Sequence, residues 1–413
     1  MPYDFAVIGA GGVIGAAIAR ELALKMRASV IALEKEQEFA AHASGRNSGV
    51  IHSGINQKPG TKKAEFCVRG SDMLRKYCVE RGVPMKQCGT LVVSRTDAEE
   101  ERLELLYKNG IAAGVPDLSY ISVEKFAERE PATARKDITK VLFSPTGAIV
   151  NSRAIVDELL TDLILHYVQY MPDKKVLDIT NDNQILTPKG KFTAKHIINC
   201  AGLYADKIAH MMGVGKQYEI IPFRGEYMQV RLPEQFNSMV YHPPANSRYP
   251  FLGIHLTRTV EETVIAGPTA VPSFGRESYD KRINFGESFE TYGSKAWWKL
   301  VAQKDFRDLA YGNFATSLFK GPFVKEIRSL LREDIAEHLT PDDVQPYRAG
   351  IRAQLVNTKA KDTPEDPIMI NDFLIIQNER GTHVLNAVSP GLTSSLAFAE
   401  HVANQIQRTV RVT

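Results

Sequence analysis

Four glycines near the N-terminus have the spacing of a phosphate-binding turn. The run from Gly9 to Gly15 reads Gly-Ala-Gly-Gly-Val-Ile-Gly, between an apolar segment at residues 4–8 and an Ala- and Leu-rich segment at 16–24. A strand, a glycine turn and a helix in this order let the backbone approach a pyrophosphate, whose charge lies at the helix N-terminus. The expected phosphate-binding residues are Gly9, Gly11, Gly12 and Gly15.

The spacing of these glycines departs from the strict G-x-G-x-x-G pattern. Counting from Gly9 leaves one extra residue before Gly15, whereas the register that ends at Gly15 puts Ala10 in the first position. Alanine fits that position only where the backbone angles suit a residue with a Cβ. The sequence leaves both registers open.

An acidic residue lies where a bound dinucleotide would need one. Glu34 follows a second apolar segment, residues 29–33, about 20 residues beyond the glycines, where a carboxylate can accept hydrogen bonds from an adenosine ribose. The glycine turn and the acid together predict dinucleotide binding. The alternative is an ordinary β-α-β unit with a glycine-rich turn, and these features alone do not separate FAD from NAD.

A polar segment punctuated by glycines, residues 42–55, is the third candidate for chemistry. It has little apolar surface to bury, and such a loop inside a compact domain usually holds a ligand. The segment contains His52, whose imidazole can take up a proton near neutral pH. A histidine between Ile51 and Ser53 is also compatible with a purely structural role.

The elements that must position these residues indicate an α/β protein. The chain of 413 residues exceeds the size at which one hydrophobic core keeps growing, so we expect two domains, which can be interleaved. Residues 4–33 predict a Rossmann-like unit, and the runs at 227–230 and 263–267 predict an antiparallel sheet elsewhere. Further predicted elements are helices over 60–81 and 97–108, a helix capped by Asn151, and strands over 89–94 and from 195.

Composition argues against several classes of function. Apolar residues make up 44% and charged residues 24%, and the net charge of +3 includes no basic run typical of a nucleic-acid-binding arm. No apolar stretch reaches about 18 residues, so no membrane-spanning helix is expected. The four cysteines lack metal or disulfide spacing, which fits a reducing compartment. We therefore expect a cytoplasmic protein without a metal site.

The segment at 296–338 leaves contact with a membrane open. It is predicted to be helical and contains Trp297, Trp298 and several Lys and Arg residues. Such a segment can lie on a membrane, here the inner membrane surface, and deliver electrons to a quinone. We favour the alternative, in which it is the solvated face of packed helices with the tryptophan pair in the core.

Six short motifs occur in order along the chain. The first is Asn-Ser-Gly-Val-Ile-His-Ser-Gly-Ile at 47–55, and the others lie at 223–227, 249–255, 267–268, 349–354 and 389–395. They resemble the family of FAD enzymes that includes D-amino-acid oxidase, sarcosine oxidase and glycerol-3-phosphate dehydrogenase. Within it the sequence is most similar to the L-2-hydroxyglutarate dehydrogenases and oxidases. The motifs run nearly to the C-terminus, so the resemblance covers the whole chain.

The resemblance implies FAD as the cofactor and assigns the domains. A discontinuous Rossmann-like FAD-binding domain would comprise residues 1–85, 150–220 and 340–413, and an α+β substrate domain on an antiparallel sheet would comprise 85–150 and 220–340. A helix beginning near residue 395 would stabilise charge on the reduced ring, although a plain capped helix is the alternative. The further cofactor-binding residues it implies are Ser44, Asn47, Ser48, Gly49, Ala201, Gly202, Pro390, Gly391, Leu392 and Thr393.

The resemblance also assigns the reacting groups. His52 matches the active-site histidine, which would take the hydroxyl proton while a hydride moves to flavin N5. Arg352, in Ala-Gly-Ile-Arg-Ala-Gln, matches an arginine that reaches the pocket, and Arg224 is the second choice, because a planar guanidinium suits a carboxylate. His255 and Tyr241 are candidate pocket donors, with structural roles as the alternative.

The expected reaction is oxidation of L-2-hydroxyglutarate to 2-oxoglutarate, with oxygen, a quinone or an electron-transfer protein as the electron acceptor. Residues 391–393 resemble the glycerol-3-phosphate oxidase form as much as the hydroxyglutarate form, so glycerol 3-phosphate is the first alternative substrate. Arg46 stands where the family more often has a smaller or neutral residue, and it could touch the FAD phosphates or face water. The second alternative is a flavin-binding protein without turnover, which the irregular glycine turn favours.

Overall fold

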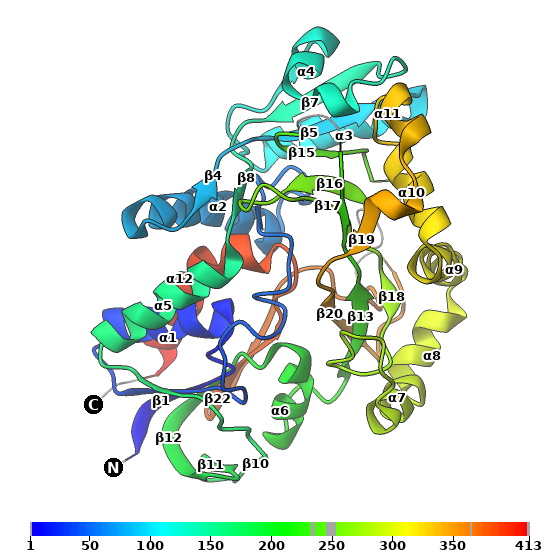
Figure 1. Ribbon diagram of the computed structural model, residues 1–413. Coiled ribbons are helices and arrows are strands. Elements are labelled where there is room, and N and C mark those ends of the chain that lie inside the picture. The colour runs from blue at the N-terminus through cyan, green and yellow to red at the C-terminus, as the bar shows by residue number, and fades with distance from the viewer. Residues whose placement is uncertain (1, 233–235, 245–252, 364–365, 411–413) are drawn as a thin grey trace.

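The computed structural model describes residues 2–232, 236–244, 253–363 and 366–410. A sheet with a parallel centre occupies the lower part of Figure 1. Its strands run β10-β11-β12-β1-β2-β9, and β22 pairs in parallel with the second half of β12 and carries β21 on its other edge. The bounds are β1 (Tyr3–Ile8), β2 (Val30–Leu33), β9 (Gln169–Met171), β10 (Asp178–Ile179), β11 (Gln184–Thr187), β12 (Gly190–Asn199), β21 (Leu374–Gln377) and β22 (Gly381–Asn386).

Helices cover both faces of this sheet, because its central strands are apolar on both sides. In β1, Phe5 and Val7 face helices α1, α5 and α12, whereas Ala6 and Ile8 face α6, as the two-residue period of a strand requires. The predicted N-cap Asn151 is confirmed, since its side chain accepts hydrogen bonds from the first turn of α5. The bounds are α1 (Val13–Met26), α2 (Lys62–Arg81), α5 (Ser152–Leu165), α6 (Ala205–Met211) and α12 (Gly391–Thr409).

A second eight-stranded sheet forms the upper part of the molecule in Figure 1. Its order is β19-β14-β17-β16-β15-β5-β7-β6, and its pairs are antiparallel except for β15 with β5. The predicted antiparallel sheet at 227–230 and 263–267 is therefore present as β14 and β17. The bounds are β5 (Thr90–Ser94), β6 (Ser119–Ile121), β7 (Lys140–Ser144), β14 (Met228–Val230), β15 (Met239–Tyr241), β16 (His255–Arg258), β17 (Val264–Gly267) and β19 (Val344–Pro346), with helices α3 (Asp97–Ala112) and α4 (Val123–Arg129).

Two three-stranded sheets lie between the large ones. In one, β13 (Tyr218–Gly225) pairs antiparallel with β20 (Gly350–Asn357) and with β18 (Val271–Pro272). In the other, β8 (Ala148–Val150) pairs with β3 (Val50–Ile51) and β4 (Met85–Lys86). Strands β19 and β20 pair with β14 and β13, which come much earlier in the chain. The division into domains at 85, 150, 220 and 340 stays a prediction.

Helices α7 to α11 follow β18 in the described chain and lie along one edge of the molecule (Figure 1). They include the segment at 296–338, and one expectation for it is wrong: Trp298 is 62% exposed, whereas Trp297 is half-buried and packs against Phe306 and Tyr292. Adjacent residues on a helix point about 100° apart, so the pair divides between core and solvent. The bounds are α7 (Phe285–Tyr292), α8 (Lys295–Ala302), α9 (Lys304–Leu318), α10 (Lys320–Arg328) and α11 (Glu333–His338).

Among the described residues, no helix is both long enough and apolar enough to cross a lipid bilayer. Part of the motif at 249–255 lies outside the described residues, but His255 is described.

Candidate active site

An elongated cavity of about 1080 Å³ lies between the parallel sheet and the strands β13 and β20. The carboxyl ends of β1, β2 and β12 form one end of it, through Ile8, Leu33 and Cys200. Ligands of open α/β sheets bind at this edge. His52 and Arg352 line the cavity together with residues of the second sheet, among them His255.

Two glycines of the turn lie so close to neighbouring backbone atoms that a larger residue would not fit at either position. Gly9 has φ +86°, and a Cβ on it would lie 2.5 Å from the carbonyl oxygen of Cys200. A Cβ on Gly15 would lie 2.3 Å from the carbonyl oxygen of Gly9. Ala10 is absent from the residues with positive φ, so Gly9 takes the left-handed turn and the motif is longer than the strict pattern by one residue.

Glu34 lies at the end of β2, buried in the cavity wall. Its Oε2 accepts a hydrogen bond from the backbone N–H of Gly11 at 2.9 Å, and its Oε1 accepts one from Glu36 at 3.0 Å. Each carboxylate oxygen can accept a second hydrogen bond. The side chain is therefore fixed against the glycine turn and retains acceptor capacity for a ribose hydroxyl.

The polar loop after β2 is held by its own side chains. Ser44 Oγ accepts a hydrogen bond from the N–H of Val13 at 2.9 Å, in the first turn of α1. Asn47 donates to the carbonyls of Ala43 and Ser44 and accepts from Gly49 at 2.8 Å. These bonds keep the loop at the cavity wall. Ser44, Asn47, Ser48 and Arg46 line the cavity, and the Arg46 guanidinium stacks on the ring of Tyr279.

Two backbone turns at helix starts also line the cavity. Ala201 and Gly202, directly after β12, line the cavity. Residues 390–393 line it at the N-terminus of α12, where a 19-residue helix presents unpaired backbone N–H groups and a partial positive charge. This arrangement suits an anionic or reducible ring system in the cavity.

His52 is fixed against that helix start. Its backbone N–H donates to Thr393 Oγ1 at 3.0 Å, and its carbonyl oxygen accepts from Cys67 Sγ at 3.6 Å. Burial, reinforced by the neighbouring charge of His255, lowers the pKa of His52 to about 4. The imidazole is therefore neutral at pH 7 and can accept a proton.

Two further side chains give this end of the cavity its polarity. Arg352 lies opposite Phe223 in the pairing of β20 with β13, and burial lowers its pKa to about 10, so the guanidinium stays charged at pH 7. His255 Nδ1 lies 3.1 Å from the carbonyl oxygen of Gly253, and burial lowers its pKa. A cation and two neutral imidazoles thus line the same cavity.

The other two predicted substrate residues are placed differently. Arg224 lies on the face of β13 opposite to Phe223 and Gly225, which line the cavity, and it forms a salt bridge with the buried Glu226. Tyr241 is buried beside His255, with the two ring centroids 5.6 Å apart, and it accepts a hydrogen bond from Asn56. Their substrate-binding roles stay predictions, as do the roles of the other candidate residues.

Three residues that the sequence analysis missed lie in the cavity wall or interact with the candidate residues. Burial raises the pKa of Tyr227, which lines the cavity and hydrogen-bonds Ser48, to about 12. The Oδ1 atom of Asn56 is buried with no hydrogen-bond partner in the described part of the chain. Burial and then the charge of Arg352 lower the pKa of buried Lys63 to about 7. Tyr227 is the last residue of the motif at 223–227 and Asn56 directly follows the motif at 47–55, but nothing in the sequence marks Lys63.

These features together define a dinucleotide-dependent oxidoreductase. The glycine turn, Glu34 and the polar loop fit an ADP-ribosyl group, and the start of α12 beside His52 fits a flavin ring. The chain belongs to the DAO family of FAD-dependent oxidoreductases, whose sequence profile matches residues 4–405. The cofactor is therefore FAD, and the predicted fold class, a Rossmann-like FAD-binding domain with a substrate domain, is confirmed.

Known proteins resemble the chain over its full length. It is 33% identical to the L-2-hydroxyglutarate dehydrogenase of Escherichia coli strain K12, over 98% of this chain and 93% of that protein. It is 32% identical to the human mitochondrial L-2-hydroxyglutarate dehydrogenase, over 98% and 89%.

Solved structures share the fold. FAD-bound L-alpha-glycerophosphate oxidase from Mycoplasma pneumoniae has a TM-score of 0.73 at 23% identity, and the match covers 99% of this chain and 95% of that one. Glycine oxidase from Geobacillus kaustophilus has a TM-score of 0.70 at 18% identity, covering 100% and 96%.

Proposed function

We propose that the protein oxidises L-2-hydroxyglutarate to 2-oxoglutarate. The observation that carries the proposal is a charged Arg352 and a neutral His52 lining the same cavity as the glycine turn and Glu34. A 2-hydroxy acid needs both groups, a cation for its carboxylate and a base for its hydroxyl. The names of the two dehydrogenases to which the chain is about a third identical support this substrate.

In this proposal His52 is the general base. Its neutral imidazole takes the proton of the C2 hydroxyl, so that the C2–O bond becomes a carbonyl as the C2 hydride leaves with its electron pair. Bound FAD supplies the two-electron acceptor for that hydride. The link from the His52 backbone to Thr393 fixes the base relative to the start of α12.

Arg352 would bind one carboxylate of the substrate through its planar guanidinium. Lys63 would add a second positive charge next to Arg352, and a bound dianion would raise its pKa from about 7 and so favour the protonated form. His255 and Tyr227 would form hydrogen bonds with the remaining oxygens of the substrate, as donors or as acceptors. The side chains at this end therefore favour a dicarboxylate over a neutral alcohol.

A substrate panel tests this proposal. Purified holoprotein would be assayed with an artificial electron acceptor and L-2-hydroxyglutarate, D-2-hydroxyglutarate or glycerol 3-phosphate, with the product identified by mass spectrometry. We expect 2-oxoglutarate from the L enantiomer alone. Turnover of glycerol 3-phosphate instead would assign the first alternative, and a flavin-loaded protein inert toward every substrate would assign the non-catalytic alternative.

The electrons must then leave the reduced protein for an acceptor. We propose one of three classes, namely oxygen, a membrane quinone or an electron-transfer protein. Reoxidation rates measured separately with dissolved oxygen and with a short-chain quinone distinguish the first two classes. Slow reoxidation by both favours an electron-transfer protein.

A further inference from the structure

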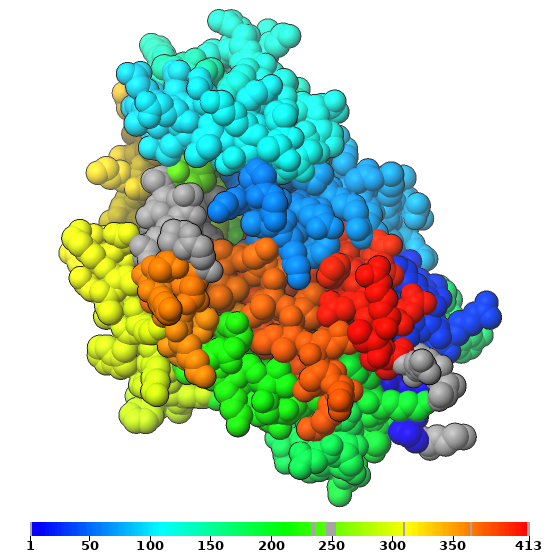
Figure 2. Space-filling view, turned by 180° about the vertical axis from the view of Figure 1, so that it is seen from behind, coloured from blue at the N-terminus to red at the C-terminus, as the bar shows by residue number. Residues whose placement is uncertain are grey.

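The segment between β18 and α7 has no regular secondary structure. It comprises residues 273–284, which we call the strap. A connection of about 12 residues without a helix or strand is uncommon in a compact protein and usually has a function. In Figure 1 the strap lies next to α6, whereas Figure 2 shows the opposite face of the molecule, on which α2 in blue and α12 in red pack side by side.

A buried ion pair holds the beginning of the strap. Arg276 donates two hydrogen bonds to the carboxylate of Asp206 in α6, at 2.7 and 2.8 Å, and both side chains are buried. Asp206 in turn accepts a hydrogen bond from the backbone N–H of Ile220 at 3.0 Å. Breaking a buried pair leaves an uncompensated charge in the interior. This end of the strap is therefore a fixed anchor.

The other end of the strap has a second anchor. Lys281 Nζ lies 3.0 Å from the Oε1 atom of the buried Glu226, and it donates to the carbonyl oxygen of Ser317 in α9 at 3.1 Å. The same Glu226 forms the salt bridge with Arg224. The strap is thus held at both ends, and residues 277–280 lie between the anchors.

Between the anchors, the strap contacts residues that line the cavity. Glu277 itself lines the cavity and forms a salt bridge with Lys35, which also pairs with Glu36. His42 Nε2 lies 2.9 Å from Glu36 Oε1, and His42 Nδ1 shares a hydrogen bond of 2.8 Å with the hydroxyl of Tyr279. One atom of each of Glu36, His42 and Glu277 lies within 4.8 Å of the other two. We call Lys35, Glu36, His42, Glu277 and Tyr279 the latch.

Ring stacking adds to the contacts of the latch. The Arg46 guanidinium lies over the ring of Tyr279, 4.1 Å from its centroid, and the His42 ring stacks on the same ring with the centroids 5.8 Å apart. Arg46 Nε donates to the carbonyl oxygen of Ala41 at 2.7 Å, which fixes the guanidinium to its own loop. Tyr279 therefore attaches the strap to the polar loop after β2.

The latch lies at the cofactor end of the cavity. Lys35 and Glu36 directly follow Glu34, the expected ribose acceptor, and His42 belongs to the polar loop. Lys35, Glu36, His42 and Glu277 all line the cavity. Lys35 and Glu277 are 242 residues apart in the chain, so their salt bridge joins two distant segments of the cavity wall.

The latch is more exposed than the anchor at Arg276. The side chains of Lys35, Glu36, His42 and Glu277 are between 25% and 34% exposed, against 5% for Arg276 and 3% for Asp206. Partly exposed ion pairs are individually weak and are screened by salt. The latch can therefore open while the buried anchor stays in place.

We propose that the strap gates the exchange of FAD. With the latch closed the strap covers the cofactor end of the cavity, and FAD enters or leaves only while the latch is open. A bridge between two segments of the wall must separate before a ligand as long as a dinucleotide can move past it. Gating of cofactor exchange does not depend on which substrate the protein oxidises.

The experiment measures how fast the holoprotein releases FAD, from the rise in flavin fluorescence after dilution. The Kd comes from the fluorescence at equilibrium over a dilution series, and the release rate divided by Kd gives the uptake rate. Glu277→Gln keeps the size of the side chain and removes its charge, so we expect release about fivefold faster. Uptake should also be faster, because a gate limits movement in both directions, and Kd should therefore change less than the release rate.

Salt and a second substitution test the ion pair itself. About 1 M salt should speed release from wild-type protein and have little further effect on Glu277→Gln. Lys35→Met should also speed release, and the double variant should show less than the product of the two single effects, since both changes remove the same bridge. Glu277→Asp, which keeps the charge, should release FAD more slowly than Glu277→Gln does.

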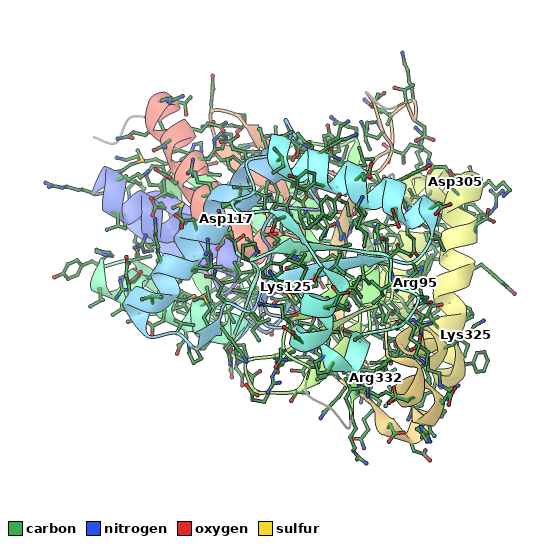
Figure 3. All side chains as sticks on the ribbon, turned by 90° about the horizontal axis from the view of Figure 1, so that it is seen from above. Arg95, Asp117, Lys125, Asp305, Lys325 and Arg332 are labelled. Atoms are coloured by element: carbon green, nitrogen blue, oxygen red, sulfur yellow. The ribbon has the colours of Figure 1, made fainter. Side chains whose placement is uncertain are left out.

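Matched controls separate gating from a general loss of stability. Asp334→Asn removes a carboxylate that pairs with Arg332 at 2.6 and 2.8 Å, and Figure 3 shows Arg332 on the side of the molecule away from α1 and α12. This variant should exchange FAD at the wild-type rate. An unchanged melting temperature shows that a variant is folded; if Glu277→Gln is not, Tyr279→Phe takes its place, with a smaller increase in release expected.

Three results would overturn the proposal. One is a folded Glu277→Gln variant that releases FAD at the wild-type rate. Another is faster release with an unchanged uptake rate, since Glu277 would then be a simple contact of the cofactor. The third is flavin that stays with the acid-precipitated polypeptide, because a covalently attached cofactor does not exchange.

Discussion

The two ends of the FAD cavity are built on different principles. The cofactor end consists largely of backbone, namely the glycine turn, the loop after β2 and the start of α12. Glu34 is the one acidic residue among those predicted to bind the cofactor. The substrate end consists of side chains from different sheets, including His52, Arg352 and His255. Close backbone packing thus defines where the cofactor binds, whereas strand register defines which side chains meet the substrate.

A single added methyl group should abolish flavin binding at the cofactor end. Gly9→Ala puts a Cβ 2.5 Å from the Cys200 carbonyl oxygen at a φ of +86°, so we expect loss of nearly all bound flavin. Gly60→Ala is the matched control, because Gly60 has φ +78° with no atom within 4 Å of its Cβ. It should keep its flavin at a cost of about 1–2 kcal/mol in stability. Full flavin content in Gly9→Ala would contradict the role of the turn; the ratio of flavin to protein absorbance decides.

The reacting group of the substrate end can be removed with the cofactor end intact. His52→Ala should keep its flavin and lose about 10²–10⁴ in kcat, because the substrate proton then lacks its base. Stopped-flow measurement of flavin reduction checks this, with the exposed His166→Ala as control. A reduction rate near that of wild type in His52→Ala would assign the base to another group.

Strand register predicts that two arginines respond differently to the same change. Arg352→Lys should raise KM for L-2-hydroxyglutarate by about 10–100-fold, since Lys cannot form the bidentate contact. Arg224→Lys should change KM by less than about threefold, because Arg224 pairs with Glu226 on the other face of β13. Steady-state kinetics of both variants decide, and equal effects would place Arg224 in the substrate site.

The smallest expected effect is the response to pH. The pKa of His52 is lowered to about 4, so the neutral base is present above that value and is lost as the pH falls through it. The value of kcat/KM should therefore be nearly flat from about pH 5 to 6 and should decline toward pH 4. A decline centred near 6.5, the ordinary histidine value, would mean that His52 is solvated during catalysis.

The sequence allows prediction of the cofactor end better than the substrate end, for a physical reason. Gly9 to Gly15, Glu34 and the loop at 42–55 are close in the chain, so their spacing alone places them together. Lys63 and Arg352 are almost 300 residues apart in the chain, yet their charges interact in the folded protein, which no local pattern encodes. Arg224 was a reasonable candidate, but the side of a strand that faces a cavity depends on its pairing.

The orientation of the surface helices is also difficult to predict from the sequence. Trp297 and Trp298 are adjacent, and the sequence does not reveal which of them faces the core, because helix orientation is set by contacts such as that of Trp297 with Phe306.

The most direct test of the central claim is an anaerobic titration of the holoprotein with L-2-hydroxyglutarate, following the visible flavin absorbance. We predict complete bleaching at about one equivalent per flavin, with 2-oxoglutarate as the product and no bleaching by the D enantiomer. An unchanged flavin spectrum in the presence of excess L-2-hydroxyglutarate would contradict the account.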